Sequence, residues 1–134
     1  MINGLHHISM KTTNDTQYAK AKSFYTEVLG LGIIMECDNC LLLDTGNGVV
    51  EIFKNGDCDL EQGVIRHFAL ATDDVDACAE KVAKAGYEVF VQPKNVLVGG
   101  VEAFPARIAF CKGPIGEEIE FFSQGWKRLW SIGL

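Results

Sequence analysis

The chain has 134 residues, of which 48% are hydrophobic and 22% are charged, a composition typical of a globular protein that buries a core. The formal net charge of −6 argues against binding to nucleic acid or to anionic membranes, because both need a basic surface. No apolar run approaches the roughly 18 residues that span a bilayer, and the N-terminus lacks the layout of a secretory signal, so we expect a cytoplasmic protein.

The first half of the chain predicts one strand, one helix and three further strands. Alternation over residues 4–11 predicts a strand with His7 and Lys11 on its wetter face. Apolar residues at helical spacing between positions 18 and 29 predict a helix that ends at Gly30. Short strands are expected at residues 31–36, 40–45 and 49–54.

The second half repeats this order. Residues 64–72 predict a strand that carries His67, followed by a helix that Asp73 or Asp74 caps and Gly86 ends. Further strands are expected at 87–92, 107–111 and 117–123, with a long loop at 93–106 and a helical tail at 124–134 that carries Trp126 and Trp130.

The five cysteines are an odd number, and without a secretory signal they are expected to be reduced thiols. Cys37 and Cys40 have C-x-x-C spacing, but the chain has no second such pair to complete a tetrahedral zinc site. They enclose Asp38 and Asn39, so we interpret them as residues that flank a hairpin turn rather than as a metal or redox pair.

A histidine and a glutamate recur at matching positions of the two halves. His7 and His67 lie in the first strand of each half, and Glu51 and Glu120 lie between apolar residues in the last strand. A carboxylate in an apolar strand must be paired or coordinated. Two imidazoles and two carboxylates suit zinc, nickel, cobalt or iron, and an octahedral ion would keep two positions open for substrate. Alternation favours His7 over His6, which we expect to be a partly buried neighbour.

The sequence resembles the vicinal oxygen chelate superfamily, and within it glyoxalase I, over nearly the whole chain. The resemblance is carried by HHI at 6–8, SFYTEVLGL at 23–31, HFAL at 67–70 and PIGEEIEF at 114–121. It implies an α+β fold in which two tandem β-α-β-β-β modules form a curved mixed sheet around a metal cleft. We expect one domain over residues 1–134, with modules at about 3–55 and 64–123 and a tail at 124–134.

The resemblance also implies a function. It implies a lyase that isomerises the hemithioacetal of methylglyoxal and a thiol, with His7, Glu51, His67 and Glu120 as ligands of nickel, zinc or cobalt. Glu120 is then the expected base and Glu51 the second candidate. Such proteins often form homodimers with sites at the subunit interface, so we expect a homodimer. Whether the site lies within one chain or is shared stays open.

Three further residues are candidates for substrate binding. By resemblance, Lys11 takes the place of an arginine that binds a carboxylate, and Asn55 matches a position that contacts glutathione. The glycine-rich loop at 96–101 lacks the family's lysine, and Arg107 or Lys94 is the candidate replacement. The thiol of the substrate is therefore undetermined.

Related functions remain alternatives. A metal-dependent CoA-ester epimerase uses the same carboxylate chemistry but tends to carry glutamine at the position of Glu51. A non-enzymatic antibiotic-binding protein of the bleomycin-resistance type has the fold without the ligand set. An iron oxygenase uses two histidines and one carboxylate, and a fosfomycin thiol transferase usually has three ligands, so a fourth ligand weighs against both.

Overall fold

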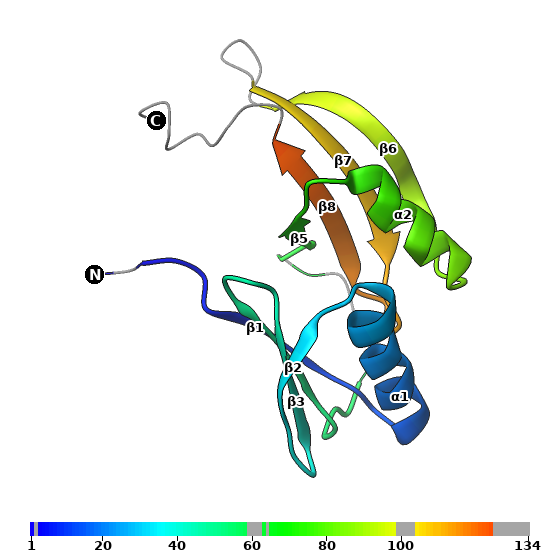
Figure 1. Ribbon diagram of the computed structural model, residues 1–134. Helices are drawn as coiled ribbons and strands as arrows, with labels where there is room; N and C mark the ends of the chain where they lie inside the picture. The colour runs from blue at the N-terminus through cyan, green and yellow to red at the C-terminus, as the bar shows by residue number, and fades with distance from the viewer. Residues whose placement is uncertain (2, 59–62, 64, 99–103, 125–134) are drawn as a thin grey trace. The chain divides into compact units, whose positions relative to one another are not determined.

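The computed structural model describes residues 1, 3–58, 63, 65–98 and 104–124. The chain forms two compact units, Met1–Gly63 with Gly113–Glu117 (unit 1) and Val64–Lys112 with Glu118–Leu134 (unit 2). Each unit contains a four-stranded mixed sheet and a helix, so the predicted α+β class is confirmed (Figure 1). The predicted tail at 124–134 lies, apart from its first residue, outside the described residues.

Unit 1 is built from four strands in the order β1-β4-β3-β2. Its first strand, β1, pairs in parallel with β4, and the other neighbours are antiparallel. The elements are β1 (His7–Lys11), α1 (Asp15–Ser23), the π-helical turn η1 (Phe24–Val28), β2 (Gly32–Glu36), β3 (Cys40–Asp44) and β4 (Val49–Phe53).

The core of unit 1 lies on one face of this sheet. Alternation places every second residue of β3 and β4 on that face, and η1 adds two buried aromatic rings. The largest fully buried apolar side chains of these elements are Phe24, Tyr25, Leu41, Leu43, Val50 and Ile52. The opposite face is left for polar residues of β1 and β4, which is where the histidine and glutamate of this half lie.

The start of α1 is fixed by a side-chain cap. The Oδ1 of Asn14 accepts a hydrogen bond of 2.8 Å from the backbone N–H of Gln17. We expect Asn14→Ala to lower the free energy of unfolding by about 1 kcal/mol, because that N–H loses its protein acceptor. Urea unfolding followed by circular dichroism measures this, and an unchanged midpoint would contradict a capping role.

Unit 2 repeats the arrangement with the order β5-β8-β7-β6. Its β5 pairs in parallel with β8, and Asp74 caps the helix by accepting from the N–H of Ala77 at 3.0 Å. The buried side chains Val75, Ala79 and Val82 of the helix face the sheet. The elements are β5 (Phe68–Ala71), α2 (Val75–Lys84), β6 (Val89–Val98), β7 (Phe104–Lys112) and β8 (Glu118–Gln124).

The long loop expected at residues 93–106 is wrong. Residues up to Val98 continue β6, and β7 begins at Phe104. The ladder is interrupted by a register shift between Val91 and Lys94, on either side of Pro93. A proline cannot donate to a strand ladder, so the chain passes it in a bulge and then resumes pairing, which the loss of alternation concealed.

The expectation of reduced thiols is also wrong for one pair of cysteines, since Cys37 and Cys40 are joined by a disulfide. The predicted hairpin turn explains this, because it brings their Cα atoms to 5.1 Å, within the range that a disulfide spans. The backbone N–H of Cys37 donates to the carbonyl of Cys40 at 2.9 Å, so the bond closes a turn that the backbone already forms.

The turn between β7 and β8 is packed into unit 1 through a buried carboxylate. Glu117 is 2% exposed, and it accepts hydrogen bonds from the hydroxyl of Tyr25 at 2.7 Å and from the N–H of Ile115 at 2.8 Å. Burial raises the pKa of Glu117, and these hydrogen bonds oppose the rise.

None of the helices in the described part of the chain has the length and apolar character that a membrane span requires.

Candidate metal centre

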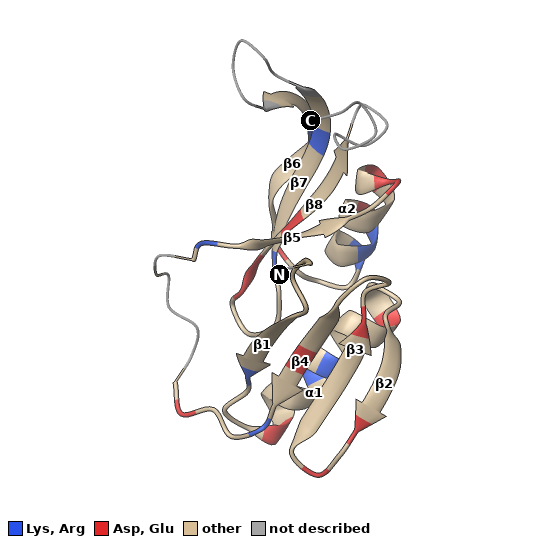
Figure 2. Cartoon of the chain, turned by 90° about the vertical axis from the view of Figure 1, so that its left-hand side faces the viewer, with Lys and Arg blue, Asp and Glu red and all other residues tan. Residues whose placement is uncertain are grey.

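In unit 1, His7 and Glu51 face each other across two parallel strands. The register pairs Ser9 with Glu51, which puts the glutamate on the face of β1 that carries His7. The Nε2 of His7 lies 3.5 Å from Oε1 of Glu51, and the side chains are 43% and 19% exposed. Glu51 is the one acidic residue of β4 (Figure 2). This half therefore offers one imidazole and one carboxylate on an accessible face.

The prediction that His6 is partly buried is wrong, because this residue is exposed. It lies just before the start of β1, so no strand covers it. Its Nδ1 is 2.9 Å from Nδ1 of His7, and the two rings meet edge to face with their centroids 5.1 Å apart. The Nε2 of His7 is left facing Glu51.

In unit 2, His67 and Glu120 form the corresponding pair. The Nε2 of His67 lies 3.3 Å from Oε1 of Glu120, and the side chains are 37% and 12% exposed. His67 was expected within a strand, but it directly precedes β5, which begins at Phe68. The register that pairs Ala69 with Glu120 still puts the glutamate within reach of the ring.

The two carboxylates differ in their surroundings. Burial raises the pKa of Glu120, whereas the nearby His67 lowers it by interaction with the carboxylate and by a hydrogen bond. The side chain of Glu120 is also less exposed than that of Glu51, at 12% against 19%.

The donors of each pair fit neighbouring positions around a divalent ion. Two ligand atoms at about 2.1 Å from an ion and 90° apart are separated by about 3 Å, close to the two observed separations. Within the described residues, no group of three or more His, Cys, Asp and Glu side chains could hold a metal ion. Each unit, taken by itself, thus supplies two donors.

Two of the predicted substrate-binding residues lie in unit 1. Lys11 is exposed and shares a strand face with His7. Asn55 is exposed and follows β4, where the chain turns so tightly that the N–H of Gly56 donates to the carbonyl of Thr12 at 2.9 Å. A Cβ on Gly56 would lie only 2.9 Å from that same oxygen, so this residue must be glycine. The structure brings Lys11 to the face of the first pair.

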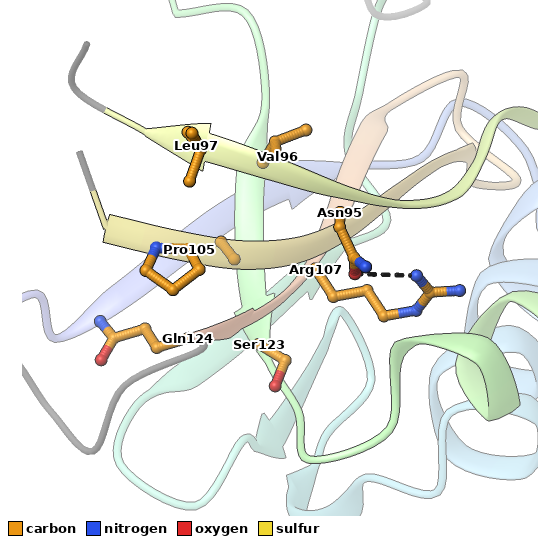
Figure 3. A pocket seen from close by; sticks show the side chains of 8 residues that line it. Asn95, Val96, Leu97, Pro105, Arg107, Ser123 and Gln124 are labelled. Carbon is orange, nitrogen blue, oxygen red and sulfur yellow. Dashed lines mark hydrogen bonds between the residues drawn. The ribbon is translucent and has the colours of Figure 1, made fainter. Parts of the chain in front are cut away.

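Arg107 is placed elsewhere. The register pairs it with Asn95 on β6 and with Ser123 on β8, and Ser123 is an odd number of residues, three, from Glu120. Arg107 therefore extends from the opposite face of the sheet to Glu120. Its guanidinium hydrogen-bonds to the carboxylate of Asp76 on α2 and donates to Oδ1 of Asn95 at 2.9 Å (Figure 3). The Asp76 carboxylate raises the pKa of Arg107.

Arg107 also lines a cavity of about 410 Å³ at the end of the sheet. Its walls come from β6, β7 and β8, and its lining residues are Asn95, Val96, Leu97, Pro105, Ala106, Arg107, Ser123 and Gln124 (Figure 3). Neither His67 nor Glu120 lines this cavity, so the structure does not bring Arg107 together with the pair of unit 2. Lys94, the other candidate, is exposed on β6.

Known proteins share both the sequence pattern and the fold. Residues 4–121 match the Glyoxalase/Bleomycin resistance protein/Dioxygenase superfamily. The chain belongs to this superfamily. Members of the superfamily commonly use divalent metal ions, and the superfamily also includes proteins that are not enzymes.

Two relatives of this superfamily protein bear the name lactoylglutathione lyase. A lactoylglutathione lyase of Arabidopsis thaliana is 34% identical over 115 residues, which cover 76% of this chain and 38% of the relative. A "Probable lactoylglutathione lyase" of Vibrio cholerae is 32% identical over 113 residues, covering 75% of this chain and 78% of the relative. The chain thus spans about two fifths of the length of the plant relative.

The fold agrees with solved structures of the superfamily. A glyoxalase/bleomycin resistance protein/dioxygenase from Alicyclobacillus acidocaldarius superposes with a TM-score of 0.69 at 17% identity, covering 92% of this chain and 93% of that one. At this identity the likeness concerns the fold alone.

Proposed function

We propose that the chain is a metal-dependent lyase of the glyoxalase I type. The proposed substrate is the hemithioacetal of methylglyoxal and a thiol, or a related molecule with two neighbouring oxygens. The observation that carries the proposal is the repeated pair of one imidazole and one carboxylate, at 3.5 Å in unit 1 and 3.3 Å in unit 2. Relatives named lactoylglutathione lyase support it.

In this proposal, His7, Glu51, His67 and Glu120 bind one divalent ion, either nickel, zinc or cobalt. The four donors come from one chain or from two chains of a homodimer. Two imidazole nitrogens and two carboxylate oxygens would hold the ion and would leave part of its coordination shell for the substrate. When bound, such an ion lowers the energy of negative charge that develops on substrate oxygens.

The proton transfer is assigned to Glu120, with Glu51 as the second candidate. A carboxylate oxygen of Glu120 takes the proton from C1 of the hemithioacetal and returns it to C2. Its limited exposure of 12% keeps that proton from exchanging freely with water during the transfer. His67, 3.3 Å away, orients the carboxylate.

The proposal is tested by metal loading followed by turnover. Purified protein is dialysed against nickel, cobalt or zinc and assayed with methylglyoxal and glutathione, and then with other low-molecular-weight thiols. We expect a thioester to form only when metal is present, and its ultraviolet absorbance measures the rate of formation. Metal binding without turnover of any of these substrates would overturn the lyase assignment and favour an epimerase or a binding protein.

Lys11 is proposed to bind an anionic group of the substrate. We expect Lys11→Met to raise KM about fivefold and to leave kcat nearly unchanged, because an exposed ion pair contributes equally before and during the reaction. Steady-state kinetics at two ionic strengths checks this. The exposed Lys20 of α1 provides the matched control as Lys20→Met. An equal rise of KM in both variants would mean that only the overall charge matters.

A further inference from the structure

The ring of Phe110 contacts the imidazole of His67 in unit 2. We propose that Phe110 is a positioning residue that holds His67 in the orientation in which its Nε2 faces Glu120. This proposal rests on the proposed metal-binding role of His67 and Glu120. It explains how unit 2 orients these two donors before a metal ion binds.

The geometry of the contact is specific. Phe110 is the direct cross-strand neighbour of Glu120, so the two side chains stand side by side on one face of the sheet. Its ring meets the ring of His67 edge to face, with centroids 5.0 Å apart and an interplanar angle of 84°. This is the arrangement that aromatic pairs prefer, and it fixes the plane of the imidazole.

His67 needs such support because the sheet does not hold it. The residue precedes β5, which starts at Phe68, and its side chain is 37% exposed. A partly exposed histidine outside a strand has several rotamers open to it. The ring of Phe110 lies against the imidazole, and Nε2 is 3.3 Å from Oε1 of Glu120.

Phe110 also contacts a second aromatic ring. The ring of Phe90, on the neighbouring strand β6, packs against it with centroids 5.7 Å apart. In unit 1, the residue paired with Glu51 at the same register is Leu42, whose side chain carries no ring. The ring that contacts His7 there is that of its neighbour His6. The two histidine–glutamate pairs are therefore held by different means.

The test compares Phe110→Leu, which removes the ring, with Phe110→Tyr, which keeps it and serves as the matched control. In metal-free protein, we expect nuclear Overhauser effects between the ring protons of residue 110 and those of His67, both in the wild type and in Phe110→Tyr. Phe110→Leu should lose the ring-current shift of the His67 ring protons. Thermal unfolding establishes that each variant is folded, and Phe110→Met replaces Phe110→Leu if the latter does not fold.

Metal binding is measured in the same variants with cobalt(II) chloride alone. We expect Phe110→Leu to weaken the Kd about tenfold and to alter the visible absorption of cobalt, while Phe110→Tyr restores both. Wild-type affinity and spectrum in Phe110→Leu, or an equal loss in Phe110→Tyr, would overturn the positioning role. A wild type that binds no cobalt would overturn the proposed function instead, and the metal-free spectra would still decide whether Phe110 orients His67.

Discussion

Replacing Glu120 with glutamine is expected to lower kcat about 10³-fold when cobalt or nickel is kept saturating. A glutamine amide retains an oxygen donor but cannot accept a proton, and a positioned base of this kind contributes roughly 10²- to 10⁴-fold. The residue is 12% exposed and lies 3.3 Å from His67, so water does not readily take over its role. Stopped assays with the methylglyoxal hemithioacetal measure the loss.

The matched control is Glu118→Gln, on the same strand and the same face two residues earlier. Glu118 is paired across the strands with Lys112 rather than with Phe110, and we expect its replacement to change kcat less than twofold. If Glu51→Gln lost activity and Glu120→Gln kept it, the base would be Glu51. Full activity in both variants would contradict a carboxylate base.

Replacing Glu117 with alanine is expected to lower the free energy of unfolding by about 3 kcal/mol. The substitution leaves the hydroxyl of Tyr25 and the N–H of Ile115 without their acceptor, and each buried unsatisfied donor costs about 1–3 kcal/mol. For a chain of this size, the melting temperature should fall by roughly 10 °C. Scanning calorimetry measures it, and a fall below about 2 °C would contradict a structural role.

The same carboxyl group predicts a pH dependence of stability. Because burial raises the pKa of Glu117, the native state binds its proton more tightly than the unfolded state does. The resulting stabilisation is fully present below the unfolded pKa of about 4.3 and is lost as pH rises through the raised native pKa. Glu117→Gln should remove this part of the pH profile in urea unfolding. An identical profile in wild type and Glu117→Gln would show that the group does not contribute.

The sequence predicted most of the fold because its signals are local. The helix at Asp15–Ser23 begins after a capping asparagine, Asn14. The helical turn that follows it, Phe24–Val28, is terminated shortly before Gly30, whose φ of 76° favours glycine. The hairpin between Val91 and Phe110 was missed in part, because Pro93 interrupts the alternation that reveals a strand. The disulfide was missed because an odd number of cysteines without a secretory signal indicates reduced thiols, although the predicted turn already had Cys37 and Cys40 at its two ends.

Part of the candidate site could also be predicted, because the two halves of the chain repeat the same pattern. The pairing of His7 with Glu51 and of His67 with Glu120 follows from strand order and alternation, which repeat in both halves. The placement of Arg107 did not follow, because the expected loop left its strand register undefined. Phe110 was not recognised either, since an aromatic residue in a strand is usually part of a core, and only the distance to His67 distinguishes it.

We expect the two histidine–glutamate pairs to bind one and the same divalent ion. Equilibrium dialysis against nickel or cobalt, with His7→Ala and His67→Ala beside the wild type, measures how many ions each chain binds and how tightly. One ion per chain is expected in the wild type, with a large loss of affinity for that single ion in each variant. Two independent ions per chain, or a variant with wild-type affinity, would contradict it.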